Sequence, residues 1–85
     1  MNQHFASLVL GLTHEAQQAL EGRLPPGSEK LGSSARQLAE HLIDTLAMLE
    51  VKTQGRLEPD EQRLLTEALT ALRFRFVQST PGTPA

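Results

Sequence analysis

The chain contains no cysteine, tryptophan or tyrosine, and only three phenylalanines among its 85 residues. Without cysteine it can form neither a disulfide framework nor a thiolate zinc site, and thiol chemistry is excluded. With aromatic residues at 4%, the core must be aliphatic, mostly Leu and Ala. Eight Lys and Arg stand against ten Asp and Glu, so the positive excess typical of non-specific binding to nucleic acid or anionic lipid is missing.

A long apolar run is also missing. The longest one near the start, residues 5–12, is far shorter than the roughly 20 residues that span a bilayer. No Lys or Arg precedes it and no small-residue cleavage site follows it, so the run indicates a helix face rather than a signal peptide. We therefore expect a cytoplasmic protein with no membrane partner.

What is present is a helical period. In three segments, apolar residues recur at three- and four-residue spacing, which places them on one side of a helix. No segment has the alternating pattern of a strand. The three stripes are Phe5, Leu8, Val9, Leu12, Ala16, Ala19 and Leu20; Ala35, Leu38, Ala39, Leu42, Ile43, Leu46 and Leu49; and Leu65, Ala68, Leu69, Leu72 and Phe76.

Capping residues predict where these helices begin. Asn2 can accept a hydrogen bond from a free N–H of the first turn, and Ser33 or Ser34 can do the same for the second helix. Glu58 occupies the cap position of the third helix, and Pro59 follows at the first helical position.

Glycines predict the helix ends, because they adopt a positive φ without steric cost. Gly22 is expected to end a first helix over residues 3–21, ahead of a loop rich in Pro, Gly and Ser over residues 23–32. Gly55 is expected to end the second helix, where Lys52 suits the negative end of the helix dipole.

A chain of this length forms one domain. Short connections make neighbouring helices antiparallel, so the prediction is an all-α, three-helix up-down-up arrangement with a tight hairpin of the second and third helices. The single domain is expected over residues 1–78, and residues 79–85 are expected to form a disordered tail with nothing to bury.

A spaced motif in the second and third helices resembles a family of small bacterial proteins classified as a domain of unknown function. The resemblance extends over about residues 5–77, and Glu58 departs from the Thr or Ser usual at that position. It implies a helical, soluble bacterial protein and carries over no activity, cofactor or catalytic residue. The motif reads Ile43-Asp44-x-Leu46-x-Met48-Leu49-Glu50-x-Lys52-Thr53-x-Gly55-x-Leu57, then Leu72-Arg73-x-Arg75-Phe76-Val77.

Residues suited to catalysis or metal binding are sparse. His41 and Asp44 are three residues apart on one helix, but a metal site needs three or four ligands. His14 is expected on the solvent side of the first helix. No serine is placed for a hydrolytic triad, and there is no Gly-rich phosphate loop. We expect no metal, no cofactor and no enzymatic activity. An enzyme of unknown class is therefore the third hypothesis, after an interaction module and a nucleic-acid-associated regulator.

Four apolar residues lie off the main stripes: Met48, Val51, Phe74 and Val77. Scattered surface hydrophobics are common, so these four are compatible with a monomer. Contiguous apolar surface, however, usually indicates a protein partner, and most soluble oligomers are symmetric dimers. We therefore predict a homodimer built mainly on the second and third helices, with these four residues at the interface and another protein as a possible partner.

Charged residues suggest two further hypotheses. In the first, Asp44 pairs with Arg73 or Arg75 across the dimer interface; the simpler alternative is a solvated carboxylate. In the second, the basic residues near one end bind nucleic acid, although acidic residues share that end and no aromatic platform is present. Those basic residues are Arg23, Lys30, Arg36, Arg73 and Arg75.

The function predicted from sequence is thus a homodimeric protein–protein interaction or accessory module. A weak nucleic-acid-associated regulator is the alternative, although we expect no nucleic-acid partner.

Overall fold

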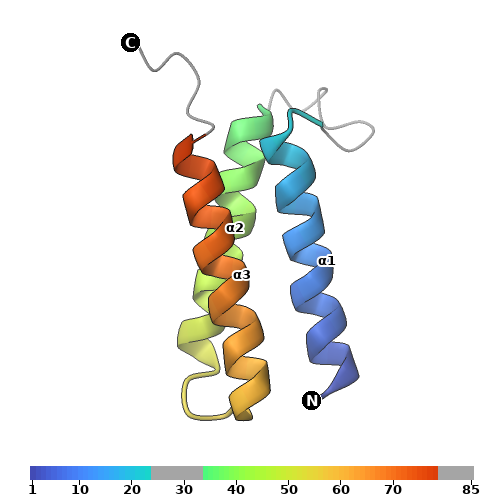
Figure 1. The fold of residues 1–85 in the computed structure, drawn as a ribbon, viewed down its shortest axis with the longest axis vertical. Coiled ribbons are helices and arrows are strands. Elements are labelled where there is room, and N and C mark those ends of the chain that lie inside the picture. Colours follow the sequence, from blue (N-terminus) through green and yellow to red (C-terminus); the bar gives the residue numbers. More distant parts are fainter. Residues whose placement is uncertain (24–33, 79–85) are drawn as a thin grey trace.

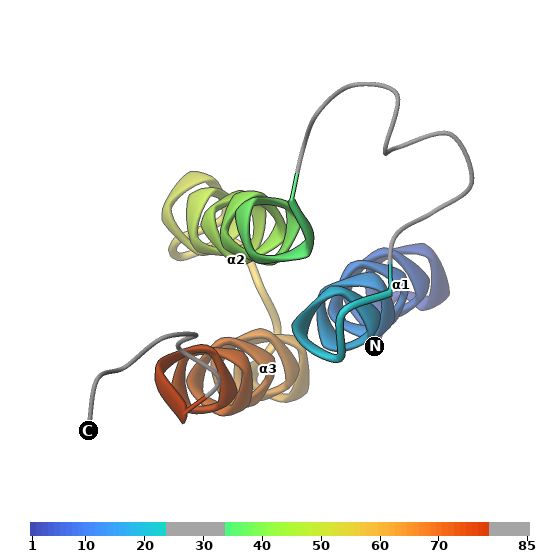
Figure 2. The ribbon, with the colours of Figure 1, turned by 90° about the horizontal axis from the view of Figure 1, so that it is seen from above.

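The computed structural model describes residues 1–23 and 34–78, and within these ranges it contains three helices and no strand. They are α1 (Gln3–Leu20), α2 (Ala35–Lys52) and α3 (Pro59–Gln78). Figure 1 shows α1 and α3 running upward and α2 downward, with a short turn joining α2 to α3. Seen from above, the three helices form a triangle in which each contacts the other two (Figure 2). The predicted all-α, up-down-up fold is confirmed.

The first two helices begin at the predicted residues. The Asn2 side chain accepts a hydrogen bond of 2.9 Å from the Phe5 N–H, which satisfies one of the free donors of α1. Ser34, rather than Ser33, caps α2. Its hydroxyl oxygen accepts from the Gln37 N–H while the Gln37 side chain accepts from the Ser34 N–H, a complete capping box.

The helix ends differ slightly from prediction. Gly22 has a φ of 88°, and α1 ends at Leu20, two residues before it. The second helix ends at Lys52 and not at Gly55. Thr53 is its C-cap, and the Thr53 hydroxyl donates to the Leu49 carbonyl at 2.6 Å. Gly55, with a φ of 79°, instead lies in the turn that reverses the chain into α3.

The core follows the predicted stripes with one exception. Its buried members come from all three helices, and Leu46, Leu65 and Leu72 are wholly inaccessible to solvent. Leu8 is the exception, because its side chain is 48% exposed. Its neighbour Val9, about 100° away around α1, is fully buried and takes the place toward the bundle axis.

The loop and the tail predicted for residues 23–32 and 79–85 lie mostly or wholly outside the described residues. Among the helices that are described, none has both the length and the apolar character needed to cross a bilayer.

Candidate functional site

The residues predicted for an interface all lie on the surface of α2 and α3. Of the four apolar side chains, Met48 is 45% exposed and Phe74 is 64% exposed, while Val51 and Val77 are each 70% exposed. The two charged residues of the predicted set, Asp44 and Arg73, are also exposed. None of these side chains takes part in the core, so their apolar surface is available for contact with another molecule.

A groove of about 220 Å³ lies between α2 and α3 and brings together three of the predicted residues. Ile43, at 7% exposed, is the least exposed residue of its lining, and Phe76 is half-buried. We call this groove between α2 and α3 the upper groove. Its lining consists of Glu40, Ile43 and Asp44 from α2, with Arg73, Phe76 and Val77 from α3. The upper groove therefore has an apolar base, two acidic groups on one wall and one cation on the other.

A second depression, of about 330 Å³, lies nearer the turn and contains the predicted residue Val51. It is lined by Glu50, Val51, Gln54 and Gln62. Two of its polar side chains, those of Glu50 and Gln62, are bonded within the chain. The Gln62 amide donates to the Thr66 hydroxyl at 3.1 Å, and that hydroxyl donates to the Glu50 carboxylate at 3.1 Å. These bonds connect α3 to α2 and occupy polar groups that a ligand would otherwise use.

Met48 and Phe74 line neither depression. On a helix, Met48 is about 40° from Asp44, and Phe74 is about 100° from Arg73. The two side chains therefore lie on the outer flanks of the α2/α3 face, one beside each helix. They widen the apolar surface around the upper groove without forming part of its wall.

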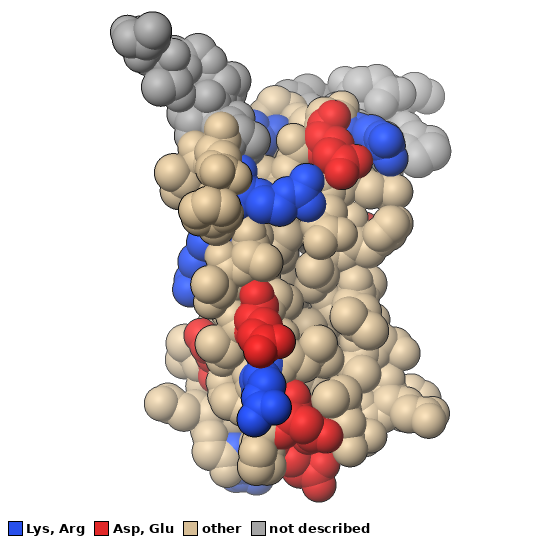
Figure 3. All heavy atoms as spheres, in the orientation of Figure 1, with Lys and Arg blue, Asp and Glu red and all other residues tan. Residues whose placement is uncertain are grey.

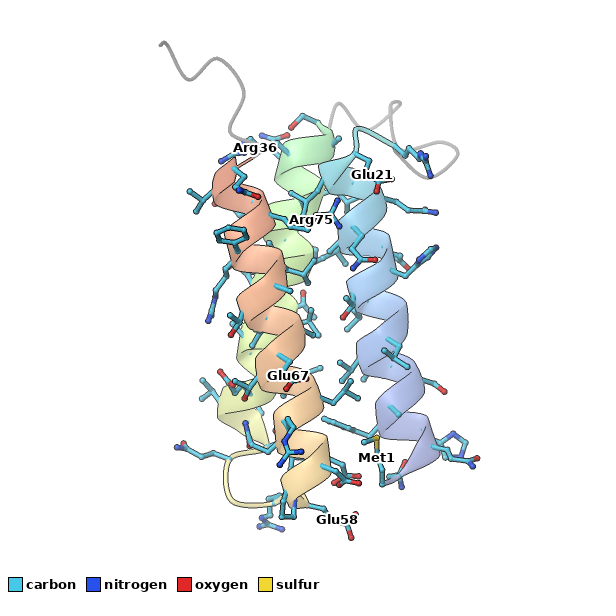
Figure 4. All side chains as sticks on the ribbon, in the orientation of Figure 1. Met1, Glu21, Arg36, Glu58, Glu67 and Arg75 are labelled. Atoms are coloured by element: carbon cyan, nitrogen blue, oxygen red, sulfur yellow. The ribbon has the colours of Figure 1, made fainter. Side chains whose placement is uncertain are left out.

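Arg73 differs from the other arginines at this end of the bundle. Arg75 lies 3.5 Å from Glu21 of α1, and Arg23 lies 3.5 Å from the same carboxylate. Figure 4 shows Arg75 and Glu21 facing each other across α3 and α1. Arg36 stacks 3.8 Å above the Phe76 ring. Among the described residues, no carboxylate lies within 4.0 Å of the Arg73 guanidinium.

These contacts bear on the two charge hypotheses. Arg75 is directed toward α1, so of the two proposed partners of Asp44 only Arg73 lies on the same groove. The end of the bundle where the basic residues were predicted to gather also carries acidic residues. Figure 3 shows acidic and basic side chains next to one another at this upper end and along α3. Lys30, the remaining member of the predicted basic group, lies outside the described residues.

The structure also contains a buried charged residue that the sequence analysis missed. Glu61, in the first turn of α3, is only 6% exposed. Its carboxylate accepts hydrogen bonds from the Asn2 N–H at 2.7 Å and from the Glu58 N–H at 2.9 Å. These two donors hold the pKa of Glu61 below its ordinary value of 4.5.

Glu61 thus ties the start of α1 to the start of α3. The three-residue spacing of Glu58 and Glu61 is the spacing of a capping box, and this signal was available in the sequence. The bond to Asn2 was not predictable from local pattern, because it joins residues 59 positions apart. At the same end of the bundle, the Met1 amino nitrogen lies 3.3 Å from the Glu58 carboxylate (Figure 4).

The histidines form no shared site. His14 is exposed and its Nε2 atom lies 3.1 Å from the Gln18 amide nitrogen, while His41 is exposed on α2. In the described ranges, no group of three or more His, Asp or Glu side chains is arranged to hold a metal ion.

Comparison with known proteins adds one finding. No curated protein and no solved structure matches the chain. One family model matches residues 2–78, nearly the whole chain and all three helices. The protein therefore belongs to the family described as Domain of unknown function (DUF1844).

Proposed function

We propose that this protein is a homodimeric protein–protein interaction module of the bacterial cytoplasm, with an accessory rather than an enzymatic role. The observation that supports the proposal most is the exposure of four apolar side chains on one helical hairpin, one of which, Val77, lines a groove with an apolar base. Large apolar side chains at 45–70% exposure leave considerable apolar area in water. Removing that area from water contributes about 25 cal/mol per Å² of apolar surface, which is partly offset by the freedom that the two partners lose on association.

A second copy of the chain is the partner we propose for the α2/α3 face. Symmetric dimers are the most common oligomers, and such an interface uses the same patch on both subunits. The patch then has to complement itself. The upper groove meets this requirement, because it presents acidic groups on α2 and a cation on α3.

Sedimentation equilibrium over a micromolar concentration range tests the proposal. The wild-type chain should sediment with twice the 9.3 kDa mass of one protomer. Replacing both Val51 and Val77 with Lys should shift it to the monomer mass, because the new charges would be buried without partners. Leu10→Lys is the matched control: Leu10 is 55% exposed, but it lies on α1 and should leave the dimer intact.

A single species of monomer mass at every concentration would contradict the proposal. Equal dissociation of the Leu10→Lys control would show that the hairpin face is not the interface. If the chain is monomeric but forms a salt-sensitive complex with random DNA or RNA, the nucleic-acid alternative replaces it.

A further inference from the structure

The charges of the upper groove indicate how two copies would be oriented. We infer that the two-fold axis of the dimer runs parallel to the helices, so that α2 of each protomer packs antiparallel on α3 of its partner. In this arrangement Glu40 and Asp44 face the partner's Arg73, and the contact occurs twice. The inference rests on the proposed function, since it specifies the geometry of the same interface.

Two orientations need to be compared for two hairpin faces in contact. If the axis is parallel to the helices, rotation exchanges the sides of the face, so α2 lies against the partner's α3. If the axis is perpendicular to the helices and lies in the contact plane, α2 lies against the partner's α2. In the second case the rotation also inverts height along the bundle, so the two grooves meet only when the axis crosses at their level. Acidic groups then face acidic groups and Arg73 faces an identical arginine. Like charges brought together in an interface are costly, so the first orientation is favoured.

The heights of these residues along the bundle fit the first orientation. Arg36 contacts Phe76 near one end of the α2/α3 pair, and Glu50 contacts Thr66 toward the other. Interpolation between these two contacts puts Glu40 level with Arg73, and Asp44 less than one helical turn away. Rotation about an axis parallel to the helices preserves height. The partner's Arg73 therefore arrives opposite both carboxylates.

The state of Arg73 in the single chain agrees with this assignment. Glu40, Asp44 and Arg73 are all exposed around one groove. Within the described part of the chain, none of the three forms an ion pair at 4.0 Å or less, whereas Arg23 and Arg75 both pair with Glu21. Closing the interface would exclude water from the groove and strengthen the attraction between opposite charges.

Charge exchange tests the pairing. Arg73→Asp should weaken the dimer at least tenfold, and Asp44→Arg should weaken it by a similar factor. The double variant carrying both changes should recover most of the lost affinity, because the same pair is rebuilt in reverse. Arg63→Asp is the matched control: Arg63 is exposed on α3, carries the same charge and lines neither depression, so its affinity should stay near wild type.

Cross-linking tests the orientation directly, and the absence of cysteine makes it unambiguous. The variants Asp44→Cys and Arg73→Cys are prepared separately, mixed in equal amounts and treated with a short bismaleimide. The inferred orientation gives mainly a mixed 44–73 product. The alternative orientation gives mainly 44–44 and 73–73 products, and that result would overturn the inference.

These outcomes separate the two proposals. A monomeric wild-type chain refutes the homodimer itself. A wild-type dimer that is unaffected by Arg73→Asp, or that yields only like-with-like cross-links, refutes the charge pairing and leaves the homodimer in place.

Discussion

At the scale of single residues, Glu61 is the clearest case of a charged group used in folding. A buried carboxylate is expensive unless hydrogen bonds satisfy it, and here two backbone N–H groups do so. One of them belongs to Glu58, the residue just before α3, and the other belongs to Asn2, the cap residue of α1. The group therefore fixes two helix N-termini relative to each other.

The lowered pKa of Glu61 predicts how stability depends on pH. A carboxyl group whose pKa is lower in the folded than in the unfolded chain contributes stability above its unfolded value of 4.5. That contribution should be lost as the pH falls from about 5 through the folded pKa. Urea denaturation at pH 7, 5, 4 and 3 measures it. Glu61→Gln should be less stable than wild type at pH 7, and the difference should shrink toward pH 3.

Glu67→Gln is the control for this series, because Glu67 is exposed on the same helix (Figure 4). Its difference from wild type should be small at pH 7. A Glu61→Gln difference from wild type that stays constant down to pH 3 would contradict the assignment.

The aliphatic core gives a second prediction at the residue scale. Leu46 is completely buried between the helices, so Leu46→Ala should lower the free energy of unfolding by about 2–5 kcal/mol. Leu10→Ala removes the same atoms from a side chain that is 55% exposed, and it should change stability by less than about 0.5 kcal/mol. Chemical denaturation of both variants measures the change. An equal loss of unfolding free energy in the two variants would show that Leu46 is not part of the core.

At the scale of helices, the sequence predicts those features that depend only on residues a few positions apart in the chain. The starts of α1 and α2 follow from Asn2 and Ser34, because each cap bonds to a backbone N–H only three residues away. The apolar stripes likewise predict the core. Local pattern fails where a second helix decides the outcome, as with the bond from Asn2 to Glu61 and the stacking of Arg36 on Phe76.

The candidate interface was partly predictable for the same reason. Exposure of Val51 and Val77 follows from their angle on each helix, which the sequence contains. The upper groove does not follow from these angles, because its shape depends on how closely α2 and α3 pack. Sequence alone left Arg73 and Arg75 as equal partners for Asp44, and only the contact of Arg75 with Glu21 separates them.

Two glycines should respond in opposite ways to the same substitution. Gly11 lies in the middle of α1 with open space where a Cβ would be, so Gly11→Ala should stabilise the protein by about 0.5–1 kcal/mol. Gly55 has a φ of 79°, which costs an L-residue about 1–2 kcal/mol, so Gly55→Ala should destabilise it. Guanidinium denaturation of the two variants measures both effects. A loss of stability in Gly11→Ala would contradict the open space at that position.

At the scale of the whole molecule, the three helices form a bundle with a fully buried core and with exposed apolar side chains on the outer side of the α2/α3 hairpin. All three pairs of helices pack together, and the wholly buried side chains account for the fold. Four exposed apolar side chains of the α2/α3 hairpin add nothing to this core, and the same hairpin carries a groove lined by charges of both signs. A small bundle gains stability by covering such a face, so folding and association should be linked.

That linkage predicts a thermal midpoint that depends on protein concentration. If two copies dissociate as they unfold, mass action raises the midpoint by about 3–6 °C for each tenfold increase in concentration. Scanning calorimetry from about 10 μM to 1 mM measures the shift. The variant with Lys at positions 51 and 77 should melt at one temperature throughout, because a monomer unfolds independently of concentration. A constant midpoint in the wild-type chain as well would mean that the exposed face stays uncovered in solution, and the homodimer would have to be abandoned.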